Sequence, residues 1–388
     1  MDTKTIRQKL MDDSNGRLFS FSSASEKYMK GGISTGSIVL DYMTAGGFRK
    51  GYPTAIWGNP GTMKTTACIL AAAQAIKSDP SKAILYVDTE IRLNPEYQQK
   101  TAAGVEIHPL ADRSKFNKTK GVWVITDDDG AELDMTPDEY DAAAKPEAEA
   151  LQEQLGENID IYAGGSSEDL LDFLLHKVCP SQAYQMIIID SQDKLIPSRV
   201  LEKDENSFQQ GSRAQFLNAW AARLHPLIWE HEIALLYTSQ MRQAMVQYGS
   251  PDTMGGGRGF RHSLSLLVKF SAPKVEIVNF RGKQRLGQTI NIRIEDSRIC
   301  NETAIGASAG FDPGKFSTAR LIFGHGWDND EALGRLGEHF GFITGRFKYM
   351  TDDGIEIKGR SKQELIDNIR AEGKLHELWK KVVDKSAE

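Results

Sequence analysis

The segment from residue 58 to residue 66 has the residue order of a phosphate-binding loop. An apolar run at residues 55–57 precedes it and a second apolar run at residues 67–73 follows it, which predicts a strand, a glycine-rich turn and a helix. Backbone N–H groups of such a turn and the positive end of the helix both attract an anion. The residues expected to hold a nucleotide are Gly58, Asn59, Pro60, Gly61, Thr62, Met63, Lys64, Thr65 and Thr66.

Lys64 and Thr65 have the side chains that this chemistry requires. A lysine at this position reaches the outer phosphates, and the following hydroxyl holds a magnesium ion, so the expected cofactors are ATP and Mg²⁺. Met63 stands where the usual pattern has a second glycine. We expect Met63 to adopt right-handed helical φ and ψ, which a residue that opens a helix can do without strain. The alternative is a Pro-Gly turn before an ordinary helix.

Three further polar residues follow apolar runs that read as buried strands. Asp190 is expected to be a second magnesium ligand, and Glu90 to orient and activate an attacking water. The Gln240 amide can contact both a γ-phosphate and a neighbouring loop. Ligands bind at the carboxyl edge of open α/β sheets, where all three would lie. The alternative for Glu90 is a solvated surface carboxylate.

The segment from residue 241 to residue 262 is rich in glycine and polar residues. We expect it to be mobile and unable to pack a core. Arg258 and Arg261 would suit a nucleic-acid backbone, and Met254 or Phe260 could stack against bases. The alternative is a flexible hairpin without a ligand.

Apolar runs and helical patterns alternate along the chain, which predicts an α/β fold with a mainly parallel sheet and right-handed crossovers. The expected strands are 83–88, 159–162, 186–190 and 233–237, and the expected helices begin at 94, 167 and 212. Beyond Gly259, three consecutive antiparallel strands are expected at 265–270, 274–279 and 289–295. A hairpin at 347–357 and helical patterns predict a small C-terminal α/β lobe. The acidic segment 108–156 is read as an inserted subdomain, in which Asp127, Asp128 and Asp129 form a turn; the alternative for this triplet is a metal site.

Bulk composition limits the class of protein. The 388 residues carry a formal net charge of −6 and are 40% hydrophobic and 26% charged, which is ordinary for a globular protein. No apolar run approaches the roughly 18 residues of a membrane span. Three cysteines without metal-binding spacing indicate a reducing compartment, so we expect a cytoplasmic protein without a membrane partner. A simple electrostatic DNA binder is usually basic, so a nucleic-acid site would have to be local.

Taken in order, these segments resemble the RecA family of strand-exchange ATPases, in particular its UvsX-type phage branch. The resemblance covers about residues 30–350. The segments that carry it are 33–37 (ISTGS) with Leu40 and Asp41, 86–90 (YVDTE) with Asn94, Pro95 and Tyr97, 188–191 (IIDS), 238–242 (TSQMR), and 249–253 (GSPDT) with Gly255 and Gly256.

The resemblance implies roles for individual residues. Glu90 matches the general base, Gln240 the γ-phosphate sensor and Tyr97 the aromatic that stacks on adenine. Arg298 matches a cation that reaches the neighbouring subunit's γ-phosphate, although Asp296 stands where the family has a second cation. The residues implied to bind DNA, around the loops 201–211 and 241–259, are Arg199, Lys203, Arg213, Arg242, Met254, Gly255, Gly256, Gly257, Arg258, Phe260 and Arg261.

The resemblance also implies an organisation and an activity. It divides the chain into an N-terminal oligomerisation arm (1–30), a RecA-like ATPase core (31–325) and a C-terminal lobe (326–388). The implied activity is ATP-dependent filament formation on single-stranded DNA with strand exchange into homologous duplex DNA, in the host cytoplasm if the gene is a phage's. Accessory mediator and single-strand-binding proteins are the implied partners. A hexameric helicase with the same core and a non-catalytic recombination mediator remain alternatives.

Overall fold

A computed structural model provides the structure of the chain. It describes residues 3–14, 18, 31–103, 114–117, 120, 122–126, 132–198, 212–243, 252–280, 283–298, 317–345 and 347–387. None of the helices in these ranges is long and apolar enough to cross a membrane.

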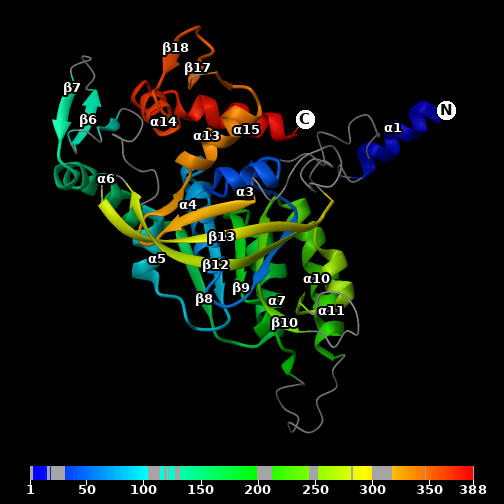
Figure 1. Cartoon of the computed structure of the whole chain (residues 1–388). Coiled ribbons are helices and arrows are strands. Elements are labelled where there is room, and N and C mark those ends of the chain that lie inside the picture. The colour runs from blue at the N-terminus through cyan, green and yellow to red at the C-terminus, as the bar shows by residue number, and fades with distance from the viewer. Residues whose placement is uncertain are drawn as a thin grey trace.

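A ten-stranded sheet forms the centre of the described structure (Figure 1). Its strand order is β15-β14-β13-β12-β3-β10-β9-β4-β8, with β11 beside β10. The run from β12 to β8 is parallel, so the predicted mixed α/β fold with a mainly parallel sheet is confirmed. The strands are β3 (Pro53–Gly58), β4 (Ala83–Asp88), β8 (Ile159–Ala163), β9 (Tyr184–Asp190), β10 (Ala234–Gln243), β11 (Asp252–Met254), β12 (Leu266–Phe280), β13 (Lys283–Ser297), β14 (Thr318–Ile322) and β15 (Gly326–Asp328).

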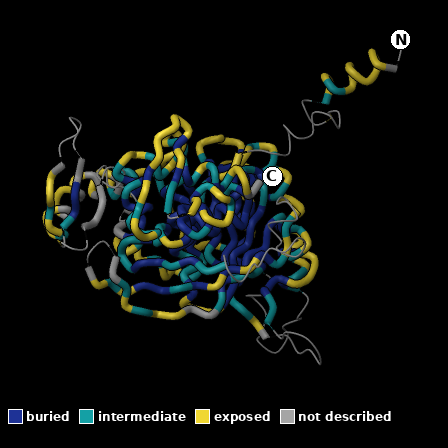
Figure 2. The backbone as a smooth tube through the Cα atoms, turned by 45° about the horizontal axis from the view of Figure 1, so that its top comes forward, coloured by how far each residue is buried: buried dark blue, intermediate teal, exposed yellow. Residues whose placement is uncertain are grey.

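Helices cover both faces of this sheet because the central strands are apolar on both sides. On β3, Ile56 faces one core cluster, which includes α3 (Ile38–Met43) and α4 (Lys64–Ser78). Ala55 and Trp57 face the other cluster, which includes α7 (Ser167–Phe173) and α10 (Ser212–Glu230). Figure 2 shows the buried chain concentrated in this centre. The two helical layers therefore hold the carboxyl ends of β3, β4, β9 and β10 in fixed positions.

The antiparallel extension is present, but its strands differ from the prediction. The expected strands 265–270 and 274–279 are one strand, β12, and the expected strand 289–295 is part of the equally long β13. Their pairing shifts register between Leu267 and Val268 and between Ser271 and Lys274. Such irregularities bend a strand without ending it, which explains why the break in the apolar pattern predicts a turn inside what is one strand.

The inserted segment contains its own small sheet. Its antiparallel strands are β5 (Ser114–Asn117), β6 (Val122–Thr126) and β7 (Glu132–Met135), and α6 (Pro137–Asn158) returns the chain to the core. The Thr136 hydroxyl and the Glu139 carboxylate form a reciprocal capping box at the start of α6. The acidic triplet 127–129, predicted to form a turn, lies outside the described residues.

A smaller α/β unit follows β15. It contains α13 (Asp330–His339), β16 (Ile343–Thr344), β17 (Lys348–Met350), β18 (Glu356–Lys358), α14 (Lys362–Ala371) and α15 (Leu375–Ala387). The strands β17 and β18 form the hairpin predicted at 347–357. Asn329 Oδ1 accepts the Ile38 N–H at 3.0 Å, and Asn329 Nδ2 donates to the Gly36 carbonyl at 2.9 Å. This unit is thus hydrogen-bonded to the segment that opens α3.

The remaining elements are short or peripheral. They are α1 (Thr3–Asp13), β1 (Gly32–Ile33), β2 (Phe48–Arg49), α5 (Pro95–Ala103), the π-helical turn η3 (Leu174–Val178), α8 (Cys179–Ser181), the 3-10 turn η4 (Gln192–Lys194) and α11 (Gly257–Ser263). Helix α1 lies apart from the sheet in Figure 1 and exposes two apolar side chains at helical spacing, Ile6 and Leu10. Its packing on another subunit stays a prediction, as do the proposed domain boundaries.

Candidate functional site

The glycine-rich segment joins β3 to α4, as the sequence predicts. Gly58 ends β3 where no side chain fits, because a Cβ there would lie 2.1 Å from the Phe270 carbonyl oxygen on β12. Gly61 has a φ of +74°, and a Cβ added there would meet no atom within 4 Å. The loop is therefore held tightly against the sheet at its first residue and is open at its middle, which suits the approach of a phosphate.

Met63 differs from the expectation. It is the residue before α4, and its φ of 61° and ψ of 27° place it in the left-handed region. The prediction of right-handed helical angles is therefore wrong. The loop needs the backbone geometry that a glycine would supply without strain, and Met63 adopts it at a cost of roughly 1–2 kcal/mol. Its side chain packs in part against the core around α4.

Lys64 lies over the loop that it follows. Its ammonium donates to the carbonyl oxygens of Gly58 at 3.0 Å and Asn59 at 2.8 Å. Burial lowers the pKa of Lys64, and the nearby carboxylates of Asp190, Asp193 and Glu90 act in the opposite direction. A phosphate bound in the loop would add negative charge beside this ammonium and would favour its charged form.

Asp190 and Thr65 meet at the carboxyl edge of the sheet. The Thr65 hydroxyl donates to Asp190 Oδ2 at 2.5 Å. Tyr86 Oη donates to the same oxygen at 2.7 Å, and the Thr238 hydroxyl donates to Asp190 Oδ1. These bonds fix the carboxylate in one orientation. A hydroxyl and a carboxylate are the hard oxygen ligands that Mg²⁺ prefers, so these residues fit the expected magnesium site.

Glu90 and Gln240 also meet, although Glu90 lies just after β4 and Gln240 lies on β10, far apart in the sequence. Gln240 Nε2 donates to Glu90 Oε1 at 3.0 Å, and the Ser191 hydroxyl donates to the same oxygen at 3.0 Å. In the parallel pairing of β10 with β3, Gln240 is the register partner of Gly58, the first residue of the loop. A residue that could activate water and an amide that could sense a phosphate are thereby brought into direct contact beside the loop.

Tyr97 and Arg298 lie outside this hydrogen-bonded cluster. Tyr97 is in the first turn of α5, where its N–H donates to Asn94 Oδ1 at 3.1 Å and its side chain is 37% exposed. Arg298 is exposed, and its backbone N–H donates to the Ser265 carbonyl at 2.9 Å. Their expected contacts with adenine and with a neighbouring subunit stay predictions.

No group of three or more His, Cys, Asp or Glu residues that could hold a metal ion is found in the described ranges. This is compatible with a magnesium site that has one carboxylate, Asp190, and takes further oxygens from phosphates.

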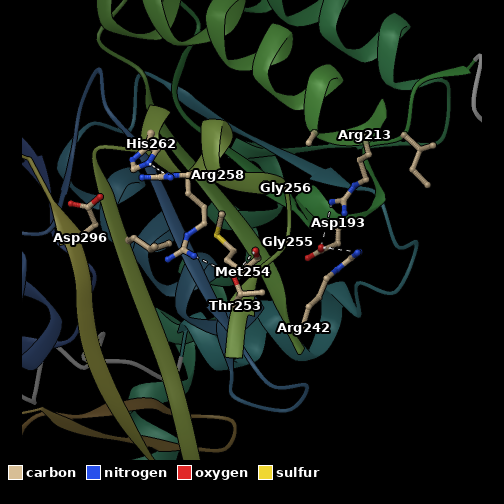
Figure 3. Close-up of a pocket in the computed structure, with 15 residues that line it drawn as sticks. Asp193, Arg213, Arg242, Thr253, Met254, Gly255, Gly256, Arg258, His262 and Asp296 are labelled. Atoms are coloured by element: carbon tan, nitrogen blue, oxygen red, sulfur yellow. Dashed lines mark hydrogen bonds and ion pairs between the residues drawn. The ribbon is translucent and has the colours of Figure 1, made fainter. Parts of the chain in front are cut away.

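A second feature lies on the other side of Gln240. A cavity of about 780 Å³ opens between η4, α10, β10, β11 and α11 (Figure 3). We call it the arginine pocket. Its charged and titratable lining consists of Arg213, Arg242, Arg258, Arg261, His262, Asp193 and Asp296. Cations outnumber carboxylates in this lining, so the pocket is a locally basic site on a chain whose net charge is negative.

The segment 252–263 is more ordered than the sequence suggested. It forms β11, which pairs with β10, and the helix α11. Phe260 is fully buried and packs edge-on against Tyr237, with ring centroids 5.2 Å apart, and Met254 is 2% exposed. This corrects the expectation that these two side chains stack on bases, because both fill the core in this conformation. Residues 244–251 lie outside the described ranges.

Arg213 also requires a correction. It is 9% exposed, and its guanidinium donates to the Gln192 carbonyl at 2.9 Å and to Gln192 Oε1 at 3.1 Å. Arg213 therefore holds η4 rather than offering a free cation at the surface. Arg242 and Arg258 are exposed and Arg261 is half-buried, as a phosphate contact requires. The other predicted cations, Arg199 and Lys203, lie outside the described residues, together with the loop 201–211.

Sequence reasoning missed the residues that connect the two features. Asp193 is 8% exposed and Gln192 and Ser239 are fully buried, and their hydrogen bonds join η4, β10 and α10. The available signal was weak: two polar residues follow Asp190-Ser191, and a serine precedes Gln240. Their burial depends on the packing of η4 against β10, which no local pattern reports.

The parallel sheet with helices on both faces, with a glycine-rich loop opening α4, defines the class as an α/β protein with a RecA-like core. Comparison with known proteins is in agreement. A sequence model of the RecA N-terminal domain family matches residues 150–305. The chain is similar to the RecA proteins of Nostoc sp. PCC 7120 (24% identical, covering 84% of this chain and 72% of that protein) and Streptomyces ambofaciens (22% identical, covering 91% and 77%). It is also similar to RecA of Nostoc punctiforme (23% identical, covering 90% and 79%). These matches support a relationship to the RecA family.

Proposed function

We propose that this chain is an ATP-dependent DNA recombinase of the UvsX-type phage branch. It would polymerise on single-stranded DNA, pair that strand with homologous duplex DNA and exchange strands. The observation that carries the proposal is the contact between Gln240 Nε2 and Glu90 Oε1 at 3.0 Å, beside Gly58. It joins a candidate base to a candidate phosphate sensor at the edge of the loop. The similarity to RecA proteins supports the choice of DNA as the ligand along which the subunits assemble.

ATP and Mg²⁺ are the proposed cofactors. The loop N–H groups and the Lys64 ammonium would bind the phosphates, and Thr65 and Asp190 would hold the metal ion, whose chemistry is to neutralise charge on the phosphates. Glu90 would orient a water and accept its proton, because its Oε1 is already held by Gln240 and Ser191. Gln240 would exchange its contact with Glu90 for one with the terminal phosphate.

Assembly follows from the same proposal. Head-to-tail contacts that do not close into a ring give an open helix, and a ligand that binds one assembly state better shifts the population towards it. ATP would favour the filament that binds single-stranded DNA, and hydrolysis would release it. Accessory mediator and single-strand-binding proteins are part of the proposal, as is a bacterial cytoplasm as the site of action.

The test is ATP hydrolysis by purified protein with and without single-stranded DNA. Lys64→Ala should abolish turnover, and Glu90→Gln should still bind ATP but hydrolyse it about 10²-fold or more slowly. Lys77→Ala, at the exposed end of the same helix α4, and Glu96→Gln, on the surface of α5, are the matched controls and should behave as the wild type. Full turnover in Lys64→Ala would remove the nucleotide site.

Electron microscopy of the protein with ATP and single-stranded DNA separates the proposal from its alternatives. Helical filaments support the recombinase, closed six-membered rings indicate a helicase, and DNA binding without any hydrolysis indicates a mediator.

A further inference from the structure

Asp193 lies between the candidate nucleotide site and the arginine pocket, and its two oxygens have different partners. Oδ2 accepts the backbone N–H of Gln240 at 2.7 Å and the Ser239 hydroxyl at 2.8 Å. These two bonds fix β10 at Gln240, the residue whose side chain reaches Glu90. The position of Gln240 therefore depends directly on this carboxylate.

The other oxygen faces the arginine pocket. Asp193 Oδ1 lies 3.4 Å from Arg213 Nη2 and 3.4 Å from Arg242 Nη2. The carboxylate side chain is 6% exposed, whereas the Arg242 side chain is 54% exposed. Figure 3 shows both guanidinium groups directed at Asp193. A single buried carboxylate is thus shared between one buried cation, Arg213, and one cation that solvent and ligands can reach, Arg242.

The backbone of the segment 252–257 closes over the same carboxylate. A Cβ on Gly255 would lie 2.5 Å from Asp193 Oδ1 and 3.2 Å from Arg242 Nε. The absence of a side chain at Gly255 therefore allows the segment to rest on Asp193 and Arg242 together.

We propose that Asp193 is a positioning residue that couples nucleotide binding at Gln240 to phosphate binding in the arginine pocket. The inference rests on the proposed function. A single-stranded DNA phosphate that binds Arg242 competes with Asp193 for that guanidinium, since one cation cannot be fully paired with both. A shift of Gln240 towards a bound nucleotide moves the groups that hold Oδ2, so it changes how strongly Oδ1 retains Arg242. Each ligand thereby alters the affinity for the other, as reciprocal coupling requires.

Asp193→Asn tests the coupling without changing the size of the side chain. A carboxylate accepts hydrogen bonds at both oxygens, whereas a carboxamide has one acceptor oxygen and one donor nitrogen, so one of the two sides loses its partners. The measurement is the fluorescence anisotropy of a fluorescein-labelled oligo-dT, with Mg²⁺ and a non-hydrolysable ATP analogue and without nucleotide. The wild type should bind more tightly with the analogue. The ratio is the dissociation constant without nucleotide divided by the one with the analogue. In Asp193→Asn this ratio should fall by about fivefold or more, mainly because binding without nucleotide becomes tighter.

Asp296→Asn is the matched control. Asp296 lines the same pocket and is exposed, and its removal changes the charge equally without touching the bonds that Asp193 makes to β10. It should tighten DNA binding with and without analogue alike and leave the ratio at the wild-type value. An unchanged ratio in Asp193→Asn, or an equal fall of the ratio in both variants, would overturn the coupling.

Ser239→Ala keeps the inference testable if Asp193→Asn does not fold. It removes one of the two donors to Oδ2 and leaves the pocket charges intact, so it should lower the ratio without tightening binding in the absence of nucleotide. A wild-type ratio in Ser239→Ala would then refute the proposal. If the wild-type protein bound DNA equally tightly with and without the analogue, the proposed function itself would be contradicted.

Discussion

At the scale of single residues, Met63 shows that the phosphate-binding loop keeps its backbone conformation without the usual second glycine. Its φ of 61° is the conformation that a glycine would adopt freely. The sequence pattern therefore lacks a glycine at a position where the fold still requires glycine-like backbone angles. Strain of this kind persists only where the surrounding structure determines the conformation. Here β3, the loop and α4 provide that structure.

Substitution at Met63 measures this strain. Met63→Ala and Met63→Gly both lose the side-chain packing, so their difference isolates the backbone contribution. We expect Met63→Gly to be more stable than Met63→Ala by about 1 kcal/mol, because only glycine takes left-handed angles without a steric cost. Urea unfolding of the two variants gives the difference. Ala222→Gly on the exposed side of α10 is the control and should have the opposite sign, a loss of about 1 kcal/mol. Equal stability of the two Met63 variants would show that the loop relaxes.

At the scale of helices and strands, the sequence predicts what depends on local pattern. Asp190, Glu90 and Gln240 could be assigned to one sheet edge because each follows an apolar run and parallel strands end together. The role of Asp193 could not, because its burial arises when η4 packs against β10 and α10. The same limit explains Phe260: an aromatic residue among glycines looks exposed until α11 places it against Tyr237. The length of β12 does not follow from the sequence because a bulge has the same local pattern as a turn.

Gly255 tests how tightly β11 and α11 rest on the centre of the molecule. In Gly255→Ala the new methyl group meets Asp193 Oδ1, which also contacts Arg242 of β10 and Arg213 of α10. We expect a loss of roughly 1–3 kcal/mol in the free energy of unfolding, as for other overpacked sites. Urea unfolding measures this loss.

A control at an open glycine gives the comparison. A Cβ on Gly31 would meet no atom within 4 Å, so Gly31→Ala should leave the unfolding midpoint within experimental error of the wild type. If Gly255→Ala were as stable as Gly31→Ala, the segment would have room that the structure does not show.

At the scale of the whole molecule, nucleic-acid binding depends more on where charges and added units lie than on the net charge of the chain. The inserted sheet contacts the C-terminal unit where β5 lies against α14, and α6 lies against α5, so these additions surround one side of the core. The arginine pocket opens on a different group of elements, between α10 and α11. A formal net charge of −6 is therefore compatible with nucleic-acid binding only if attraction is concentrated in such a pocket and repeated along an assembly.

The salt dependence of DNA binding tests that concentration of charge. Each phosphate neutralised on a single strand contributes about −0.7 to the slope of log affinity against log salt. Arg258→Gln removes an exposed cation of the arginine pocket and should reduce the magnitude of this slope by about 0.7 per subunit contact. The control is Arg223→Gln, which changes the net charge equally on a part of α10 that does not line the pocket and should reduce the slope less. Anisotropy titrations of labelled oligo-dT between 50 and 300 mM salt, roughly the range in which such slopes are resolved, give both values. If the two variants changed the slope alike, attraction would follow net charge, and the arginine pocket would not be the surface that holds the strand.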